Sequence, residues 1–385
     1  MLNRRRGRVR SVQGVSTHIQ RLLVEIDGEL VPTVNYRVLA ADVHPGDLIE
    51  VNTTAVDLGL GTGGTHFLIS RIDSDHDMSS TTSQSSPKET GHIMKLRYTP
   101  LQLSTLSVEE ESSLYHGILQ EVDSLEGMPV LVGSLHSLIA PAAAVLQQNT
   151  NRSARLVYVM TDGAALPLGF SRLVASLQNQ GLISATITIG HAFGGDLEAV
   201  NIYSALLAGR HVLKADACIV AMGPGVVGTG TPFGTTAMEI AGILDGVNAL
   251  GGRAVAIPRI SFADERPRHY GISHHTLTAL GKLCHSRCFI PFPQLHPEED
   301  ELLRQQCQIA ALDRHHLSFT TEDNTLQLLQ DYDLHVTSMG RTAQEDPAFF
   351  RAGGAAGRLA AEWILSAEKW EPKAQLGDGI PPMVD

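Results

Sequence analysis

Residues 215–234, ADACIVAMGPGVVGTGTPFG, are the stretch that decides the fold. An apolar run over 217–222 leads into a turn with five glycines, and a helical pattern resumes near Thr236. The order strand, flexible loop, helix is typical of anion- and nucleotide-binding turns. Glycine lets the backbone approach a ligand closely, and the free N–H groups at a helix start attract negative charge. We therefore expect this loop to form the floor of a ligand site, through Gly223, Gly225, Gly228, Thr229 and Gly230.

Around this loop, from residue 91 onward, short apolar runs alternate with helical patterns. Runs that are apolar on both faces indicate parallel strands covered by helices, and strict alternation indicates right-handed βαβ units. We expect a doubly wound, mostly parallel α/β domain, with a (β/α)₈ barrel as the alternative. The expected strands are 129–135, 155–160, 185–189, 217–222, 253–257 and 288–292, with weaker ones at 316–320 and 334–338. Helices are expected at 108–123, 197–207 and 357–366, among others.

The first 72 residues have a different pattern. Four short β-prone runs, 8–15, 21–26, 30–36 and 48–52, are separated by turn signals such as Asp27-Gly28. Short strands this close together favour a small OB-like or SH3-like barrel. Residues 73–90 are rich in Ser and Thr and nearly devoid of apolar side chains, as a linker would be. The expected domains are therefore 1–72, a linker at 73–90, and an α/β domain at 91–385.

Composition limits the class of protein. A chain of 385 residues with 43% apolar and 18% charged residues fits a globular protein of about two domains. The net charge of −12 disfavours general nucleic-acid binding, and no apolar stretch is long enough to span a bilayer. Four cysteines make no disulfide framework and suit a reducing compartment. We expect a cytoplasmic protein without membrane or nucleic-acid partners, and the sequence leaves open whether it forms a homo-oligomer.

Polar residues follow the expected strands, where ligands of parallel sheets bind. Asp162 follows the second strand and His191 the third. Glu198 and Asn201 are three residues apart on the next expected helix, so both would point to one side. Alternatives remain for each: Asp162 would equally hold a turn, Asp196 would cap that helix, and Glu198 would face the helix dipole.

The segment after the fifth strand, DERPRHYGISHHT at 264–276, has the highest density of residues that can bind a ligand or transfer a proton. Arg266 and Arg268 suit binding of a phosphate or carboxylate, because guanidinium groups donate in pairs. His269 and His274 suit proton transfer or metal binding. We expect at most one of the adjacent His274 and His275 to face the site. The residues assigned to catalysis are Asp162, His191, His269 and His274.

Familiar cofactor motifs are absent from the sequence. The loop has no GKS or GKT, no GxGxxG follows the first strand, and no HExxH or GxSxG is present. Cys284, His285 and Cys288 lie close together, but a zinc site needs further ligands, so structural zinc is the less favoured interpretation. The sequence therefore identifies neither a metal nor a cofactor.

Several long motifs resemble one family. The motifs are NTTAVDLGLGTGG, GHIMKLRYTP, TDGAALPL, HAFGGDLEAVNIYSALLA, GPGVVGTGTPFG and ISFADERPRHYGISHHT, and they resemble the bacterial family of unknown function DUF3866 over nearly the whole chain. The resemblance implies a bacterial, cytosolic origin. It implies no reaction and assigns no catalytic residues.

Together these features favour an enzyme that acts on a phosphorylated or otherwise anionic small molecule. The loop and the two arginines would hold the anion, a histidine would carry the proton, and Asp162 or Glu198 would assist or bind a metal. The alternative is a non-catalytic sensor or regulatory adaptor that uses the same pocket, and a weaker one is a scaffold whose glycines serve only packing.

Overall fold

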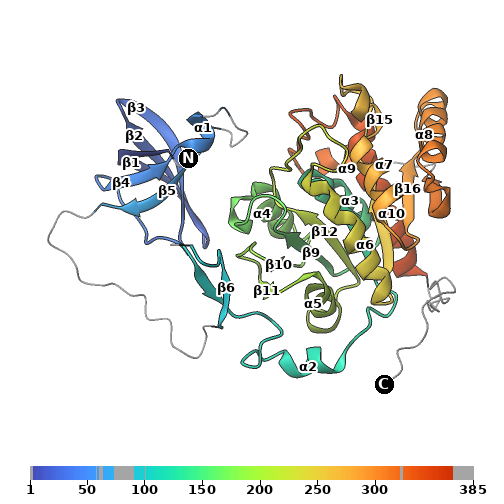
Figure 1. The fold of residues 1–385 in the computed structure, drawn as a ribbon, viewed down its shortest axis with the longest axis horizontal. Helices are drawn as coiled ribbons and strands as arrows, with labels where there is room; N and C mark the ends of the chain where they lie inside the picture. The colour runs from blue at the N-terminus through green and yellow to red at the C-terminus, as the bar shows by residue number, and fades with distance from the viewer. Residues whose placement is uncertain are drawn as a thin grey trace. The chain divides into compact units, whose positions relative to one another are not determined.

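The structure, a computed structural model, describes residues 3–57, 59, 64–72, 91–99, 101–320 and 324–366. The chain divides into two compact units, one of residues 1–106 and 167–171 and one of residues 107–166 and 172–385. Figure 1 shows the elements of both units. The linker expected at residues 73–90 lies outside the described part of the chain.

A closed five-stranded barrel forms the first unit, as the sequence predicts, with the strand order β1-β2-β3-β5-β4. Its β3 and β5 pair in parallel and its other strand pairs are antiparallel, an order that suits the OB-type barrel. Inward side chains such as Val9, Val24 and Ile49 form its core. The elements are β1 (Arg4–Val15), β2 (Ile19–Ile26), β3 (Glu29–Tyr36), β4 (Leu48–Asn52), α1 (Thr54–Asp57) and β5 (His66–Arg71), followed by a separate hairpin of β6 (Ile93–Lys95) and β7 (Leu103–Thr105).

The arginine-rich start of the chain lies on β1 and faces carboxylates of its own barrel. The ion pairs join Arg4 to Glu50, Arg5 to Asp27 and Asp57, and Arg10 to Glu25. Pairs at such exposed positions contribute little stability each, and they balance the charge of three of the arginines in this run.

One open, parallel sheet forms the centre of the second unit. Its described strands lie in the order β11-β10-β9-β12-β8-β13-β16-β17, which confirms the doubly wound fold over the closed (β/α)₈ alternative. Its central strands are buried along their whole length because helices cover both faces. The strands are β8 (Pro129–Gly133), β9 (Leu156–Thr161), β10 (Ala185–Ile189), β11 (Leu197–Ala199), β12 (Ala217–Met222), β13 (Arg253–Ile257), β16 (Phe289–Pro293) and β17 (His316–Thr320).

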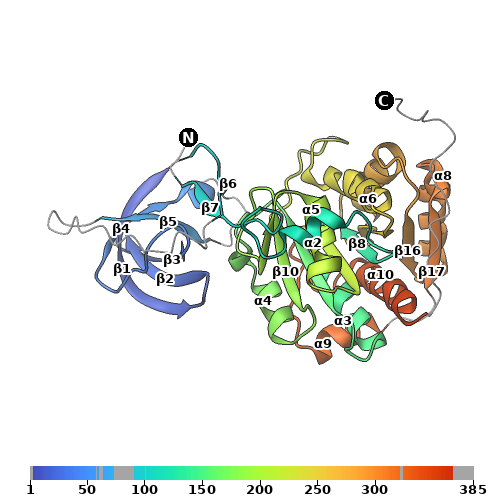
Figure 2. The ribbon, with the colours of Figure 1, turned by 90° about the horizontal axis from the view of Figure 1, so that it is seen from below.

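Helices pack against both faces of this sheet. Helices α3, α9 and α10 contact one another on one face, and α5 and α6 pack together on the other (Figure 2). The glycines of α10 let it approach α3 closely, since a Cβ at Gly357 would lie 2.2 Å from the Ala142 carbonyl oxygen. The helices are α2 (His116–Glu121), α3 (Ile139–Asn149), α4 (Arg172–Asn179), α5 (Ile202–Leu207), α6 (Glu239–Ala249), α7 (His274–Thr278), α8 (Pro297–Ile309), α9 (Thr325–Asp331) and α10 (Pro347–Leu365).

The chain changes direction at the neighbouring strands β8 and β12. After β8 it passes through α3 to β9 on one side, and after β12 it passes through α6 to β13 on the other. The loops that follow these two strands therefore separate and leave a crevice at their carboxyl ends, where doubly wound sheets bind ligands.

Four expected elements differ in the structure. The helix expected at residues 108–123 is only the six-residue α2, and turns precede it. Residues 197–207 are not one helix: Leu197–Ala199 form the edge strand β11, paired in parallel with β10, and α5 begins after Asn201. Residues 334–338 form no strand, and only Ser338 bridges, to Arg341. The last helix is longer than expected, because it starts at Pro347 rather than near Gly357. Among the described helices, none combines the length and apolar character that a bilayer span requires.

Candidate functional site

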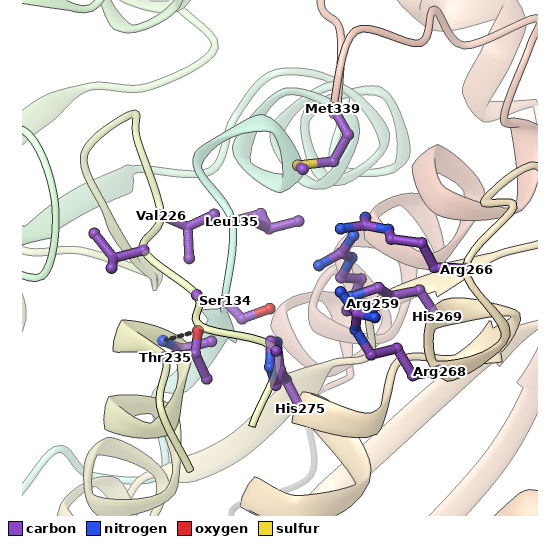
Figure 3. Close-up of a pocket in the computed structure, with 14 residues that line it drawn as sticks. Ser134, Leu135, Val226, Thr235, Arg259, Arg266, Arg268, His269, His275 and Met339 are labelled. Carbon is purple, nitrogen blue, oxygen red and sulfur yellow. Dashed lines mark hydrogen bonds between the residues drawn. The ribbon is translucent and has the colours of Figure 1, made fainter. Parts of the chain in front are cut away.

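A cavity of about 140 Å³ lies at the carboxyl ends of β8, β12 and β13. Figure 3 shows the turn after β8 and Val226 on one side, facing three arginines and His269 on the other, with Met339 at one end. The lining residues are Ser134, Leu135, Val226, Val227, Gly228, Gly230, Thr235, Ala237, Arg259, Arg266, Arg268, His269, His275 and Met339. The crevice at the switch point is thus walled by segments far apart in the sequence.

The loop after β12 folds back on itself to form one wall. A bridge between Gly228 and Thr235 closes a small hairpin, inside which the Thr229 hydroxyl donates to the Gly234 carbonyl over 3.0 Å. Gly225 and Gly230 have φ values of +102° and +80°, conformations that glycine adopts without strain. Gly223 serves packing, because a Cβ there would lie 2.4 Å from the Ala165 carbonyl oxygen.

Three arginines make the opposite wall cationic, and the described cavity lining contains no carboxylate. Behind the wall, buried Asp264 accepts hydrogen bonds from Arg266 at 2.8 and 2.7 Å and forms longer ion pairs with Arg259 and Arg341. The Arg266 hydrogen bonds hold the pKa of Asp264 well below its usual range, so it stays charged. Arg268 is exposed, and no described carboxylate lies within salt-bridge distance of it. The pocket is therefore positive within an acidic protein.

A short hairpin brings the histidines to this wall. Strands β14 (Ile260–Ser261) and β15 (Gly271–Ile272) pair antiparallel, so that His269, before the second strand, returns to the start of α7. Gly271 has a φ of +74°, and a Cβ there would lie 2.4 Å from Gln306 Oε1. Gln306 fixes the hairpin because it accepts the Ile272 amide at 2.7 Å and donates to the Tyr270 carbonyl at 3.0 Å.

All three histidines of the segment converge. The ring centroids of His274 and His275 are 3.9 Å apart, and they lie 5.0 and 5.4 Å from that of His269. Of the adjacent pair, His275 lines the cavity and His274 does not, but both stand at the first turn of α7, where the hairpin places His269 against them. Ser273 precedes the helix as expected, but its hydroxyl bonds His269 Nδ1 at 2.8 Å instead of capping the helix.

The histidines are neutral near pH 7. Burial lowers the pKa of His269 to about 3, assisted by the charges of Arg259 and Arg266. Burial likewise lowers the pKa of His275 to about 4 and lowers that of His274, where Arg268 also contributes. Uncharged imidazoles keep a nitrogen lone pair, so the cluster offers proton acceptors or metal ligands.

A second, less polar cavity of about 330 Å³ adjoins the first and shares Leu135, Val226 and Met339 with it. Gly223 and Gly225 line it, together with Leu173 and Val336. His136 also lines it and lies 3.3 Å from the Tyr158 hydroxyl, and burial lowers the pKa of this histidine to about 4. The two cavities together form one cleft with a cationic end and a largely apolar end.

Six residues assigned from the sequence line neither cavity: Asp162, His191, Glu198, Asn201, Thr229 and His274. Asp162 accepts the His191 backbone amide at 2.9 Å, which joins the loops after β9 and β10. Glu198 lies in β11 and bonds the Thr188 hydroxyl and the Gly194 amide, both at 2.7 Å. Asn201 caps α5 by accepting hydrogen bonds from the backbone amides of Tyr203 and Ser204, a role that the sequence predicted for Asp196. The expected shared helix face of Glu198 and Asn201 is therefore wrong.

Other lining residues were not assigned from the sequence. Arg259 follows β13 and is buried beside Asp264, and a basic residue directly after an apolar strand was an available signal for it. Met339 comes from the turn at residues 338–341, where no local pattern points to the sheet. Glu239, at the start of α6, lines neither cavity; it accepts the Thr161 hydroxyl at 2.7 Å, and burial beside Asp162 raises its pKa to about 7.

A second cluster with metal-ligating side chains lies in the core, formed by Cys284, Cys288 and His315. His315 Nδ1 accepts the Cys288 amide at 3.2 Å, and its Nε2 bonds the Leu280 carbonyl at 3.0 Å. The Cys284 thiol donates to the Ser286 carbonyl at 3.3 Å. The hydrogen bond with the Cys284 side chain, together with burial, raises the pKa of Cys288 far above its usual value, so the Cys288 thiol stays protonated.

The chain belongs to the protein family of unknown function DUF3866, whose model matches residues 32–357. No curated protein and no solved structure matches the chain.

Proposed function

We propose that the cleft binds a small molecule bearing a phosphate or carboxylate group and that the protein is an enzyme acting on this ligand. The observation that carries the proposal is the charge of the first cavity: Arg259, Arg266 and Arg268 line it without a lining carboxylate among the described residues. Clustered guanidinium groups with no acidic partner in the cavity are suited to an anion that enters from solvent.

The arginines differ in how they would act. Arg266 is fixed by two hydrogen bonds to Asp264, so its remaining N–H groups are preorganised toward the cavity. Arg268 is exposed and without a salt-bridge partner among the described residues, so it is available to close on the ligand. Arg259 is buried, and burial lowers its pKa to about 10, which still leaves it charged at neutral pH.

The histidines supply the reactive groups. His269 and His275 line the same cavity, and their depressed pKa values keep them unprotonated at neutral pH. A neutral imidazole beside bound anion is suited to accept a proton or to hold a metal ion. The adjoining apolar cavity would take the body of the ligand, with its anionic group between the arginines.

Binding is tested by thermal shift and calorimetry with inorganic phosphate, pyrophosphate, sugar phosphates, nucleotides and dicarboxylates, each compared with an uncharged analogue. We expect Arg268→Ala to weaken the affinity for the tightest-binding anion about tenfold or more, which is the effect of losing one charge-assisted hydrogen bond. The matched control is Arg287→Ala, which removes an exposed arginine remote in sequence from the cavity lining.

Two results would overturn parts of the proposal. If no anion stabilises the protein, or if Arg287→Ala weakens binding as much as Arg268→Ala, the pocket is not an anion site. If an anion binds through Arg268 but mass spectrometry of incubated ligands finds no conversion, and His269→Ala leaves binding unchanged, the non-catalytic sensor is favoured instead.

A further inference from the structure

We propose that His269, His274 and His275 together bind one divalent transition-metal ion of the zinc class at the wall of the arginine-lined cavity. This inference deepens the proposed function, because the ion would face the same anionic ligand. It is nevertheless testable without that ligand.

The first support is the distance between the ligating atoms. Each histidine offers one ring nitrogen, and the three nitrogens all lie within 4.8 Å of one another. Three nitrogens bound to a tetrahedral ion at ~2.1 Å are separated by roughly 3.4 Å. The rings therefore need only small movements to share an ion.

The second support is that the nitrogens lack other partners. His274 Nε2 and His275 Nε2 are buried and make no hydrogen bond. Buried polar atoms in native proteins almost always have a partner, so two such atoms in one cluster point to a ligand. His269 bonds Ser273 through Nδ1, which leaves its Nε2 for the same ion.

The third support is the way in which the rings are held from behind. His269 Nδ1 bonds the Ser273 hydroxyl, and His275 has a hydrogen bond with the backbone of Thr231. Histidines that bind metals usually donate their second ring N–H to an oxygen in this way, which fixes the tautomer and aims the other nitrogen.

The donor set decides the class of ion. Three imidazoles suit zinc, cobalt or nickel, whereas magnesium and calcium require oxygen ligands, and no Asp or Glu of the described residues joins the group. Neutral ligands leave the ion its full double charge, next to three arginines. An anionic ligand would relieve this repulsion by contacting both the ion and the guanidinium groups, so we expect metal and anion to strengthen each other's binding.

The test uses the full chain, freed of metal with a chelator and then loaded with Zn²⁺ or Co²⁺. We expect one ion per chain after desalting, and X-ray absorption at the zinc edge should show a shell of nitrogen and oxygen with imidazole scattering and no sulfur. Co²⁺ should give visible d–d bands without the near-ultraviolet band of thiolate ligation. These spectra need no variant, so they hold even if a substitution prevents folding.

Variants then locate the ion. We expect His269→Ala and His275→Ala each to weaken Zn²⁺ binding at least 100-fold, while His285→Ala, at an exposed histidine outside the cluster, leaves it unchanged. Circular dichroism would verify that each variant is folded. Absence of retained ion, sulfur in the coordination shell, or unchanged binding in both cluster variants would each overturn the assignment.

The anion proposal and the metal proposal are distinguished by measuring the binding of each ligand in the absence of the other. Phosphate binding to the metal-free protein tests the arginines, and Zn²⁺ binding to Arg268→Ala without phosphate tests the histidines. If phosphate binds but Zn²⁺ does not, the metal assignment fails and the proposed function stands. If Zn²⁺ binds but no anion does, the proposed function fails and the metal site stands.

Discussion

Among its described residues, the α/β unit contains two clusters of three metal-ligating side chains, and they differ in their surroundings. Cys284, Cys288 and His315 lie in the core, where backbone groups satisfy both nitrogens of His315. The cluster of His269, His274 and His275 borders a cavity, and two of its ring nitrogens have no hydrogen-bond partner. The first cluster is complete without a ligand and the second is not. The comparison shows that ligating residue types alone do not define a metal site. A site is open only where the ligating atoms have no hydrogen-bond partner within the protein.

The largest expected effect is on the core cluster. His315→Ala leaves the buried Cys288 amide without its acceptor and removes one of the two side-chain donors to the Leu280 carbonyl, which Arg314 also contacts. We expect unfolding free energy to fall by about 2–4 kcal/mol, measured by urea denaturation of the metal-free protein. His285→Ala is the control and should change it by less than about 0.5 kcal/mol, because His285 is exposed. Equal effects of the two substitutions would show that the core cluster is not structural.

A smaller effect on stability is expected at the cavity. His275→Ala removes a ring whose Nε2 has no hydrogen bond to lose. The metal-free protein should lose about 1 kcal/mol or less in the same denaturation measurement, mainly from contacts and the bond to the Thr231 backbone. A loss as large as that of His315→Ala would break the distinction between an open and a closed cluster.

A pH-dependent effect on stability concerns Glu239, a half-buried carboxyl group at the start of α6. Its pKa is raised from 4.5 to about 7 by burial, so between these values the folded protein keeps a proton that the unfolded chain has lost. This contribution to stability is fully present below pH 4.5 and is lost as pH rises through 7. Glu239→Gln should therefore be more stable than the parent at pH 8, and the advantage should diminish toward pH 5. Thermal unfolding across this range checks it, and an advantage that is constant with pH would contradict the assignment.

The strands of the central sheet were predictable because their residues carry the signal locally. β10, β12, β13 and β17 match the expected bounds, since a covered parallel strand is a short apolar run between turns. β11 was missed because Leu197–Ala199 is only three residues long and its pairing with β10 leaves no local pattern. The strand expected at 334–338 is absent because this segment pairs with no strand, and Val336 with its polar neighbours lines a cavity instead.

Two segments of the candidate site were predictable: the glycine-rich loop after β12 and the segment rich in arginine and histidine after β13. Arg266, Arg268 and His269 lie across a cavity from Gly228 and Gly230; the two segments follow β13 and β12, and β8 lies between these strands. No sequence pattern separates these residues from Asp162 and Glu198, which instead bond the His191 amide and the Thr188 hydroxyl. Loops at one edge of a sheet share a face, but only strand order sets which of them meet.

The sequence by itself determined a parallel α/β sheet behind a small barrel and polar loops at the carboxyl ends of the strands, because these depend on apolar runs and turn residues that act over a few positions. Tertiary structure alone decided that β12 lies next to β8, that three histidines converge through the β14–β15 hairpin, and that Cys284, Cys288 and His315 meet in the core. The physical reason is that packing brings together groups that are far apart in the sequence. Which of these groups lies next to a ring nitrogen decides whether the nitrogen is open to a ligand or takes part in a structural hydrogen bond. The loop at 223–235 is the clearest case. Its glycines let it form one wall of the cavity, but the arginines and histidines that could bind or react with a ligand belong to the segment after β13.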